Sequence, residues 1–206
     1  MCVRLRAILF LAVIAFCISM GCIDRFYEKP VTPTIPPTLT PVPTLEGTVS
    51  TIPPDEMALQ LTDLPSDYFI KDRSATSYEE QPTLNRDLGW RQGYTSEFYR
   101  MNIDTADLTV ITQTIGVYPL ENMNTVFSVE KDDLLPPVNG IKRYEIPFPA
   151  IGTKSLAVRE TDPDDVVTYT IIFISKNVAE KITMTGTTTD YEALKNIVKI
   201  AEARIR

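Results

Sequence analysis

The sequence predicts an α+β domain in which helices cover an antiparallel β-sheet. Three observations support this prediction. Apolar residues alternate with polar ones along several short runs, as they do in half-buried strands. Two other segments repeat apolar residues at helical spacing. The elements follow the order strands, middle helix, strands and closing helix, which favours a layer of helices packed on a sheet.

Five strands are expected, and the first of them carries most of the aromatic residues. Trp90, Tyr94 and Phe98 share one parity of this run, which directs them towards the core, whereas Tyr99 has the other parity and is expected to be exposed. These rings could also stack on a sugar or a partner, but a core role is favoured for most of them. The predicted strands span residues 90–98, 109–117, 154–160, 167–175 and 178–186.

Turn and cap residues define the remaining elements. A tight hairpin through Lys176-Asn177 joins the last two strands, with the asparagine supplying the turn. Pro119 opens a middle helix over 120–134, and Pro136-Pro137 ends it. The closing helix begins at a capping box, Thr189-x-x-Glu192. Its apolar stripe is expected to seal one face of the sheet and consists of Leu194, Ile197, Val198, Ala201 and Ile205.

The first 21 residues have the order of a signal peptide. Arg4 and Arg6 precede an uncharged, mostly apolar stretch over 7–20, and Gly21-Cys22 follows directly. That stretch is short for a helix that must cross about 30 Å of hydrocarbon, so an uncleaved N-terminal helix is the weaker alternative.

The segment Ser19-Met20-Gly21-Cys22 resembles the lipobox of a lipoprotein signal peptide, in which the cysteine carries the lipid and becomes the mature N-terminus. The resemblance implies lipid attachment at Cys22 and a location on the outer face of the cell membrane. The alternative is that Cys22 is an ordinary residue beside the cleavage site of a secreted protein.

Residues 22–54 are expected to form a linker. Eight prolines and seven threonines lie between Pro30 and Pro54, and proline both fixes φ and removes a backbone donor. This composition predicts an extended spacer rather than a strand or a helix. The alternating pattern starts only after it, so a single folded domain is expected over 55–206.

The charge of the chain excludes nucleic acid as a partner. The formal net charge is -7, and removal of Arg4 and Arg6 with the leader reduces the Lys and Arg count from 20 to 18 against 27 acids, which gives 18 - 27 = -9. A polyanion is repelled by such a protein.

No catalytic, metal or cofactor site is expected from the sequence. The chain has no histidine, and Cys22 is the only cysteine after the leader, so triads, histidine metal sites and thiolate chemistry are excluded. Asp162-Pro163-Asp164-Asp165 could offer oxygen ligands to Ca²⁺, but a solvated loop is favoured because the EF-hand spacing is missing. Asp132-Asp133 is a weaker candidate that is expected to face water.

Three motifs in the second half carry a resemblance to known families. They are Ile151-Gly152-x-x-Ser155-x-Ala157, the strand pair 169–186, and Asp190-Tyr191-x-x-Leu194. Together they resemble extracytoplasmic α/β/α sandwiches of the PsbP-like and LpqN-like kind. Uncharacterised stalked lipoproteins of methanogenic archaea are more similar still, and also carry a stretch like Leu61-Thr62-Asp63-Leu64-Pro65. The resemblance covers 57–206 and implies a fold and a location, but it transfers no catalytic residue.

Two functions are left open. The stalk and the empty catalytic inventory favour a non-catalytic binding or assembly module that presents a rigid domain to a protein or another ligand. The alternative is a carboxylate-dependent hydrolase of cell-surface polymers, suggested only by the acid content. A buried acid pair in a cleft would support the hydrolase, and an exposed apolar patch would support the binder.

Overall fold

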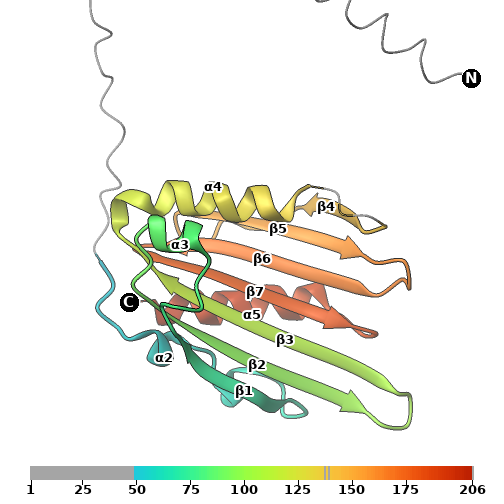
Figure 1. Ribbon diagram of the computed structural model, residues 1–206. Coiled ribbons are helices and arrows are strands. Elements are labelled where there is room, and N and C mark those ends of the chain that lie inside the picture. The colour runs from blue at the N-terminus through green and yellow to red at the C-terminus, as the bar shows by residue number, and fades with distance from the viewer. Residues whose placement is uncertain (1–48, 137, 139, 206) are drawn as a thin grey trace, which may run out of the picture. The chain divides into compact units, whose positions relative to one another are not determined.

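Seven antiparallel strands form one continuous sheet in the order β1-β2-β3-β7-β6-β5-β4 (Figure 1). The structure is a computed structural model that describes residues 49–136, 138 and 140–205. Together with the helices described below, the sheet confirms the predicted α+β fold. The strands are β1 Phe69–Thr76, β2 Gln92–Asn102, β3 Asp107–Val117, β4 Lys142–Ile146, β5 Lys154–Thr161, β6 Val167–Ser175 and β7 Val178–Gly186.

The five predicted strands correspond to β2, β3, β5, β6 and β7, and the sequence pattern missed the two edge strands. Most residues of β1 are exposed, so apolar and polar side chains do not alternate along it. β4 spans only Lys142–Ile146 and is also mostly exposed. An edge strand has one neighbour and little burial, and therefore leaves a weak periodic signal.

The predictions for Tyr94 and Phe98 are confirmed, and Trp90 is buried as expected of most of these rings, but it does not belong to the predicted strand. β2 begins at Gln92, so Trp90 precedes the strand and its parity does not apply. Phe98 is fully buried in the main core, and Tyr94 packs against that core. Tyr99 is half-buried on the other face. Trp90 packs on that other face too, in a separate cluster.

The β6–β7 hairpin uses its two turn residues differently from the prediction. The positive φ of 56° belongs to Lys176 rather than to the asparagine. Asn177 instead ties neighbouring chain segments together: its side-chain Oδ1 accepts a bond from Ser50 N at 2.7 Å, and its backbone carbonyl accepts one from Tyr118 N at 3.0 Å.

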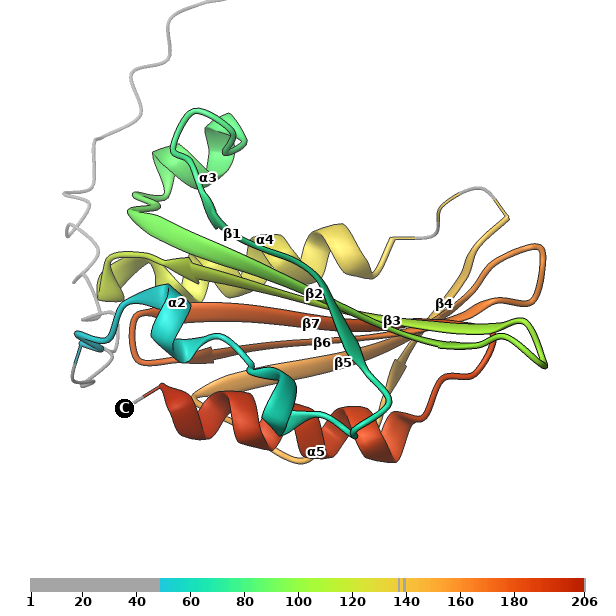
Figure 2. The same cartoon turned by 90° about the horizontal axis from the view of Figure 1, so that it is seen from below.

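One face of the sheet is sealed by α5, Tyr191–Arg204 (Figure 2). The predicted apolar stripe is confirmed, because all five of its residues are buried. The predicted cap was wrong by one residue: Asp190 is the N-cap, and its carboxylate accepts a hydrogen bond from Ala193 N at 3.0 Å. Thr189 therefore precedes the cap. Aspartate and threonine both cap well, so spacing alone did not decide between them.

Two short helices before β1 extend the cover on the α5 face. They are α2, Pro54–Met57, and the 3-10 helix η1, Leu61–Asp63. Met57 is completely buried in the main core. Arg204 Nη2 lies 2.9 and 2.7 Å from the two carboxylate oxygens of Asp63, which joins η1 to the end of α5.

The opposite face is covered only in part. The 3-10 helix η2, Leu120–Asn122, leads into α4, Met123–Leu134, which confirms the predicted middle helix. α4 contacts β5, β6 and β7, and the short α3, Thr83–Asp87, lies near one end of the sheet. No described helix lies over the remaining length of β1, β2 and β3 on this side (Figure 1). We call this uncovered surface the open face.

The leader, Cys22 and most of the linker lie outside the described residues. Lipid attachment, the signal peptide and the boundary at 21 therefore stay predictions. The boundary between 54 and 55 stays a prediction too, and the folded contacts begin before it, since Ser50 N is bonded to Asn177 and α2 begins at Pro54. None of the helices between residues 49 and 205 has the length and hydropathy of a membrane span.

Replacing Leu194 by alanine should destabilise the domain strongly. Leu194 is 0% exposed beneath α5, so the substitution removes buried methyl groups and leaves a cavity. The expected loss is about 2–5 kcal/mol of the free energy of unfolding, measured by chemical denaturation. Lys199→Ala on the exposed side of the same helix is the matched control and should change it by about 0.5 kcal/mol or less. Equal effects would mean that the stripe does not seal the sheet.

Candidate functional site

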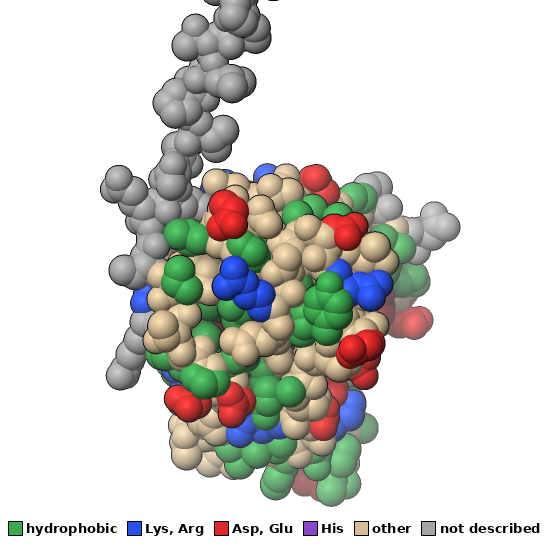
Figure 3. All heavy atoms as spheres, turned by 60° about the vertical axis from the view of Figure 1, so that its left-hand side comes forward, with side chains coloured by type: hydrophobic (Ala, Val, Ile, Leu, Met, Phe, Trp, Pro, Cys, Tyr) green, Lys and Arg blue, Asp and Glu red, His purple; other side chains and the backbone are tan. Residues whose placement is uncertain are grey.

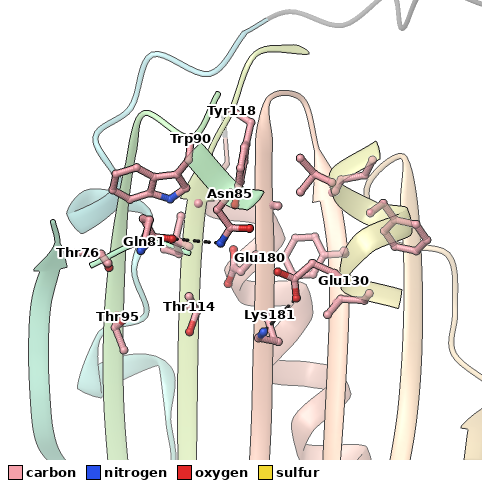
Figure 4. A pocket seen from close by; sticks show the side chains of 18 residues that line it. Thr76, Gln81, Asn85, Trp90, Thr95, Thr114, Tyr118, Glu130, Glu180 and Lys181 are labelled. Carbon is pink, nitrogen blue, oxygen red and sulfur yellow. Dashed lines mark hydrogen bonds and ion pairs between the residues drawn. The ribbon is translucent and has the colours of Figure 1, made fainter. Parts of the chain in front are cut away.

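A pocket with both polar and apolar walls lies where α3 and α4 approach the sheet at one end of the open face (Figure 4). Its volume is about 230 Å³. This is smaller than the roughly 300–1,000 Å³ of pockets that enclose drug-sized ligands, so it suits a small molecule or one unit of a larger one. Strands β2, β3, β6 and β7 form its floor, and residues of α3, α4 and the segments beside them form its walls.

Two glycines make room for the aromatic rings of the pocket. Gly93 and Gly116 face each other across β2 and β3. A Cβ on Gly116 would lie 2.8 Å from Tyr118 Cε2 and 3.5 Å from Trp90 Nε1, and a Cβ on Gly93 would lie 2.5 Å from the backbone oxygen of Ile115 and 3.0 Å from Trp90 Cζ2. Any larger side chain at these positions would displace the rings. The glycine pair therefore lets Trp90 and Tyr118 lie directly on the sheet.

The chain around Trp90 is held by backbone hydrogen bonds. Trp90 N donates to Asn85 O of α3 at 3.0 Å, and Arg91 N donates to Val117 O at 2.9 Å. Gly89, with a φ of 79°, turns the chain between α3 and the tryptophan. These bonds fix the indole at the pocket although it lies outside the strand.

Trp90 and Tyr118 bring two free hydrogen-bond groups into the pocket. Neither Trp90 Nε1 nor Tyr118 Oη is bonded to another residue in the described part of the chain, and neither atom is completely buried. Both approach the same point above Gly116. Burial, and to a lesser extent the charge of Glu130, raises the pKa of Tyr118 well above its ordinary value. The phenol therefore stays protonated and can donate.

The rest of the pocket offers both donors and acceptors. Asn85 Nδ2 donates to Gln81 Oε1 at 3.2 Å, which leaves the second amide atom of each side chain for a ligand (Figure 4). The hydroxyls of Thr95 and Thr114 have no bonded partner within residues 49–205, and Thr114 is exposed. Each hydroxyl can donate one hydrogen bond and accept two.

The charges of the pocket cancel. Lys181 Nζ lies 3.0 Å from Glu130 Oε2, and both side chains are partly exposed at the wall. At the end of the domain that carries α3, acidic and basic side chains are interspersed with hydrophobic ones rather than gathered by sign (Figure 3). The pocket therefore has no net charge with which to select an ion.

Glu180 borders the pocket through its strand, but its carboxyl points to the α5 face. It shares the parity of Ile182, whereas Lys181 faces α4. Gln113 Nε2 donates to Glu180 Oε1 at 2.5 Å, and Gln113 Oε1 accepts from Leu59 N at 2.8 Å. Glu180 Oε2 is buried with no partner among the described residues.

Burial is the main cause that raises the pKa of Glu180, to about 8. The bond from Gln113 opposes this rise, and the charge of Glu202 adds to it. The carboxyl is therefore held in its neutral form near neutral pH.

The pocket does not contain the acid pair of a glycosidase. Glu130 is the one carboxylate that faces it in the described part of the chain, and Lys181 engages that carboxylate. A retaining glycosidase requires two carboxyl groups about 5–5.5 Å apart on either side of the scissile bond. No three acidic or cysteine side chains among residues 49–205 are grouped so as to hold a metal ion.

The candidate sites considered in the sequence lie away from the pocket. Asp162 Oδ1 accepts bonds from the backbone N of Asp164 and Val166, at 2.9 and 2.8 Å, and so shapes the β5–β6 loop. Asp132 and Asp133 lie in the last turns of α4. In the motifs that carry the family resemblance, Ser155 Oγ accepts from Ile151 N and Asp63 binds the end of α5. These are packing and turn interactions.

Sequence reasoning missed the pocket. Gln81 and Asn85 come from a segment in which no element was predicted, and Trp90 was assigned to a strand, on the same side as Tyr94 and Phe98. The only signal was a pair of glycines inside two predicted strands, since glycine in a strand often marks close approach of another group.

Comparison with known proteins supports the fold and gives no family. No protein-family model and no curated protein sequence matches the chain. Among solved structures, the extracellular domain of PknH from Mycobacterium tuberculosis is similar, with a TM-score of 0.54 and 9% identity, covering 72% of this chain and 92% of that one. A putative uncharacterized protein from Mycobacterium smegmatis, the Rv0999 ortholog, covers 72% of this chain and 96% of its own with a TM-score of 0.40 and 9% identity. At 9% identity the likeness to the PknH domain shows the fold alone, and no comparison supports the archaeal part of the resemblance.

Glu180→Gln should remove a pH dependence of stability. A carboxyl with a raised pKa in the folded state stabilises that state at low pH, and the stabilisation is lost as pH rises from its ordinary pKa of 4.5 to about 8. Across that window the free energy of unfolding of the native protein should fall with a slope of up to about 1.4 kcal/mol per pH unit.

Urea unfolding at several pH values checks this expectation. The free energy of unfolding of the variant should depend less on pH than that of the native protein. At pH 8 and above the variant should be the more stable of the two, because an amide carries no charge to bury. Glu79→Gln makes the same change at an exposed position and should leave the profile unaltered. If the stabilities of Glu180→Gln and the native protein change with pH in parallel, the buried carboxyl is not the source of the pH dependence.

Proposed function

We propose that this protein is a non-catalytic, extracytoplasmic binding module that captures a small, neutral, polar ligand in the pocket beside Trp90. One observation carries the proposal: Trp90 Nε1 and Tyr118 Oη converge on one point of the pocket, and neither is bonded to another described residue. Both atoms are accessible from the pocket and have no protein partner, so a ligand or solvent can bind them together.

The preference for a neutral ligand follows from the charges. The Lys181 ammonium is engaged by Glu130 at 3.0 Å, so an anion would have to compete with that carboxylate for it. A neutral ligand with hydroxyl or amide groups can instead bind the free atoms of Gln81, Asn85 and Thr114 without disturbing the ion pair.

Binding is favoured over hydrolysis because the pocket lacks a second carboxylate. Glu130 is paired with a lysine, and Glu180 faces the other side of the sheet. The hydrolase alternative therefore has no pair of acids to act on a bond held in this pocket.

The location is proposed from the leader and the fold. The signal-peptide pattern of 1–21 and the lipobox-like segment ending at Cys22 favour a lipid anchor, with 22–54 as a spacer outside the cell membrane. The similar PknH structure is itself an extracellular domain. An uncleaved N-terminal helix is the alternative anchor.

Binding should be detectable by the fluorescence of Trp90, the only tryptophan of the chain. The full-length protein would be titrated with neutral sugars, polyols and amides, and in parallel with small anions and cations. Neutral compounds should change the emission and raise the melting temperature. Tyr118→Phe should weaken binding about three- to tenfold, because it deletes one hydrogen bond without emptying the core.

The control is Tyr144→Phe, which deletes the same hydroxyl on β4 and should bind like the native protein. The proposal fails if only charged compounds bind, if none binds, or if Tyr118→Phe binds as tightly as the native protein.

Cys22→Ser should release the protein from the membrane or leave it unprocessed. The thiol of Cys22 is the only cysteine side chain after the leader that could carry a lipid. Membrane fractionation and mass spectrometry of the mature N-terminus measure the change. Unaltered membrane association, together with a native protein that carries no lipid, would favour the uncleaved helix.

A further inference from the structure

A line of polar and aromatic side chains continues from the pocket along the open face. Antiparallel partners that stand directly opposite each other lie on the same face of a sheet. Three such pairs of β2 and β3 follow the Gly93–Gly116 pair on the pocket side. They are Thr95 with Thr114, Glu97 with Thr112, and Tyr99 with Val110.

This line is accessible over its whole length. All six side chains are at least partly exposed, and no described helix lies over them (Figure 1). At about 3.4 Å per residue, the distance from Gly93 to Tyr99 is roughly 20 Å. A ligand that fills the pocket could therefore continue along the sheet. We call the surface from Trp90 to Tyr99 the track.

A second aromatic pair marks the far end of the track. Phe69 of β1 stands opposite Tyr99, and their ring centroids are 5.6 Å apart. Phe69 is 55% exposed, so its ring is not part of the core. Trp90 and Tyr118 lie at the near end. The track thus has aromatic rings at both ends and threonine hydroxyls between them.

The middle of the track carries one ion pair and one further carboxylate, Asp72, which stands opposite Glu97 and accepts a hydrogen bond from Ser74 Oγ at 3.1 Å. Lys71 Nζ lies 2.8 Å from Glu97 Oε1, which pairs the acid of the central row. The hydroxyl of Thr112, opposite Glu97, has no bonded partner in the part of the chain that the structure describes. The available groups are therefore hydroxyls, which can both donate and accept, and the Asp72 carboxylate, which accepts from a sugar hydroxyl and repels an anionic glycan.

We propose that the track binds an extended neutral glycan, with one sugar unit in the pocket and a later unit against Phe69 and Tyr99. The proposal rests on the function proposed above and names its ligand class. A sugar ring presents hydroxyl groups at its edge and C–H groups on its faces. The threonine hydroxyls can form hydrogen bonds with the sugar hydroxyls, and the electron-rich faces of the aromatic rings can pack against the C–H groups.

Other extended ligands fit the track less well. A lipid chain would need a continuous apolar surface, whereas hydroxyls and an ion pair occupy the middle of the track. An extended peptide gains affinity by pairing its backbone with a sheet edge, and the track lies on a face.

The test is a titration of the full-length protein with a length series of neutral sugars. Glucose and N-acetylglucosamine would be compared with their short and long unbranched oligomers, with Trp90 fluorescence and calorimetry as readouts. Affinity should rise with length until the oligomer spans the track. Phe69→Ala should weaken binding of long oligomers about fivefold and leave the monomer unaffected, because only a long chain reaches that ring.

Tyr144→Ala is the matched control. Tyr144 is 53% exposed, close to the 55% of Phe69, but it lies on β4 at the opposite edge of the sheet. The Tyr144→Ala variant should bind every oligomer with the affinity of the native protein. Because both side chains are exposed, neither variant should change the melting temperature by more than a few degrees.

The outcomes separate this proposal from the preceding one. Sugar binding that is sensitive to Tyr118→Phe but independent of length would overturn the track and keep the pocket. Binding of neutral amides with no binding of sugars would overturn the glycan class and keep the pocket. Equal effects of Phe69→Ala and Tyr144→Ala on long oligomers would also overturn the track. A lack of binding by every neutral compound would overturn both proposals.

Discussion

The width of the sheet is the constraint on which the rest of the structure depends. Seven strands spaced about 4.8 Å apart make a sheet roughly 30 Å wide, whereas a helix with its side chains is about 10–12 Å across. One helix therefore covers two or three strands. On the α5 face, the segment with α2 and η1 adds to the cover, and the apolar side chains of β2, β3, β6 and β7 are buried there. On the other face α4 covers β5 to β7, and only the short α3 approaches β1 and β2. What remains uncovered must be polar enough to face water, and threonine meets that need while favouring strands.

The pocket is a consequence of this uneven cover. At the boundary between covered and open sheet, the facing glycines Gly93 and Gly116 let Trp90 and Tyr118 lie flat on the strands. Their polar atoms then point to the open side, where the described residues supply no partner. The Glu130–Lys181 pair closes the other wall without adding net charge. A binding site for a neutral molecule arises here without catalytic groups, because its parts are hydroxyls, amides and ring N–H groups on rigid elements.

Much of the fold could be predicted from the sequence, and the site could not. Residues of β3 and β7 alternate because one face is sealed by α5, and the stripe from Leu194 to Ile205 has a single helical period. β1 and α3 gave little signal, since each is short of buried residues. Parity placed Trp90 on the same face as Tyr94 and Phe98, but parity is valid only within a strand, and β2 begins two residues later, so Trp90 is buried on the opposite face. The pocket depends on which elements meet in space: Gln81 and Thr114 are far apart in the chain, and no local pattern relates them.

The most direct test of the central claim is a ¹H–¹⁵N correlation titration of the protein with a neutral oligosaccharide. Trp90 is the only tryptophan, so its indole N–H gives one resonance that reports on the pocket. The account predicts that this resonance shifts together with the amides of Thr95, Thr112 and Thr114, while the amides of Val198 and Ala201 on α5 stay in place. Shifts confined to α5 or to the β4 edge, with an unchanged indole resonance, would contradict it.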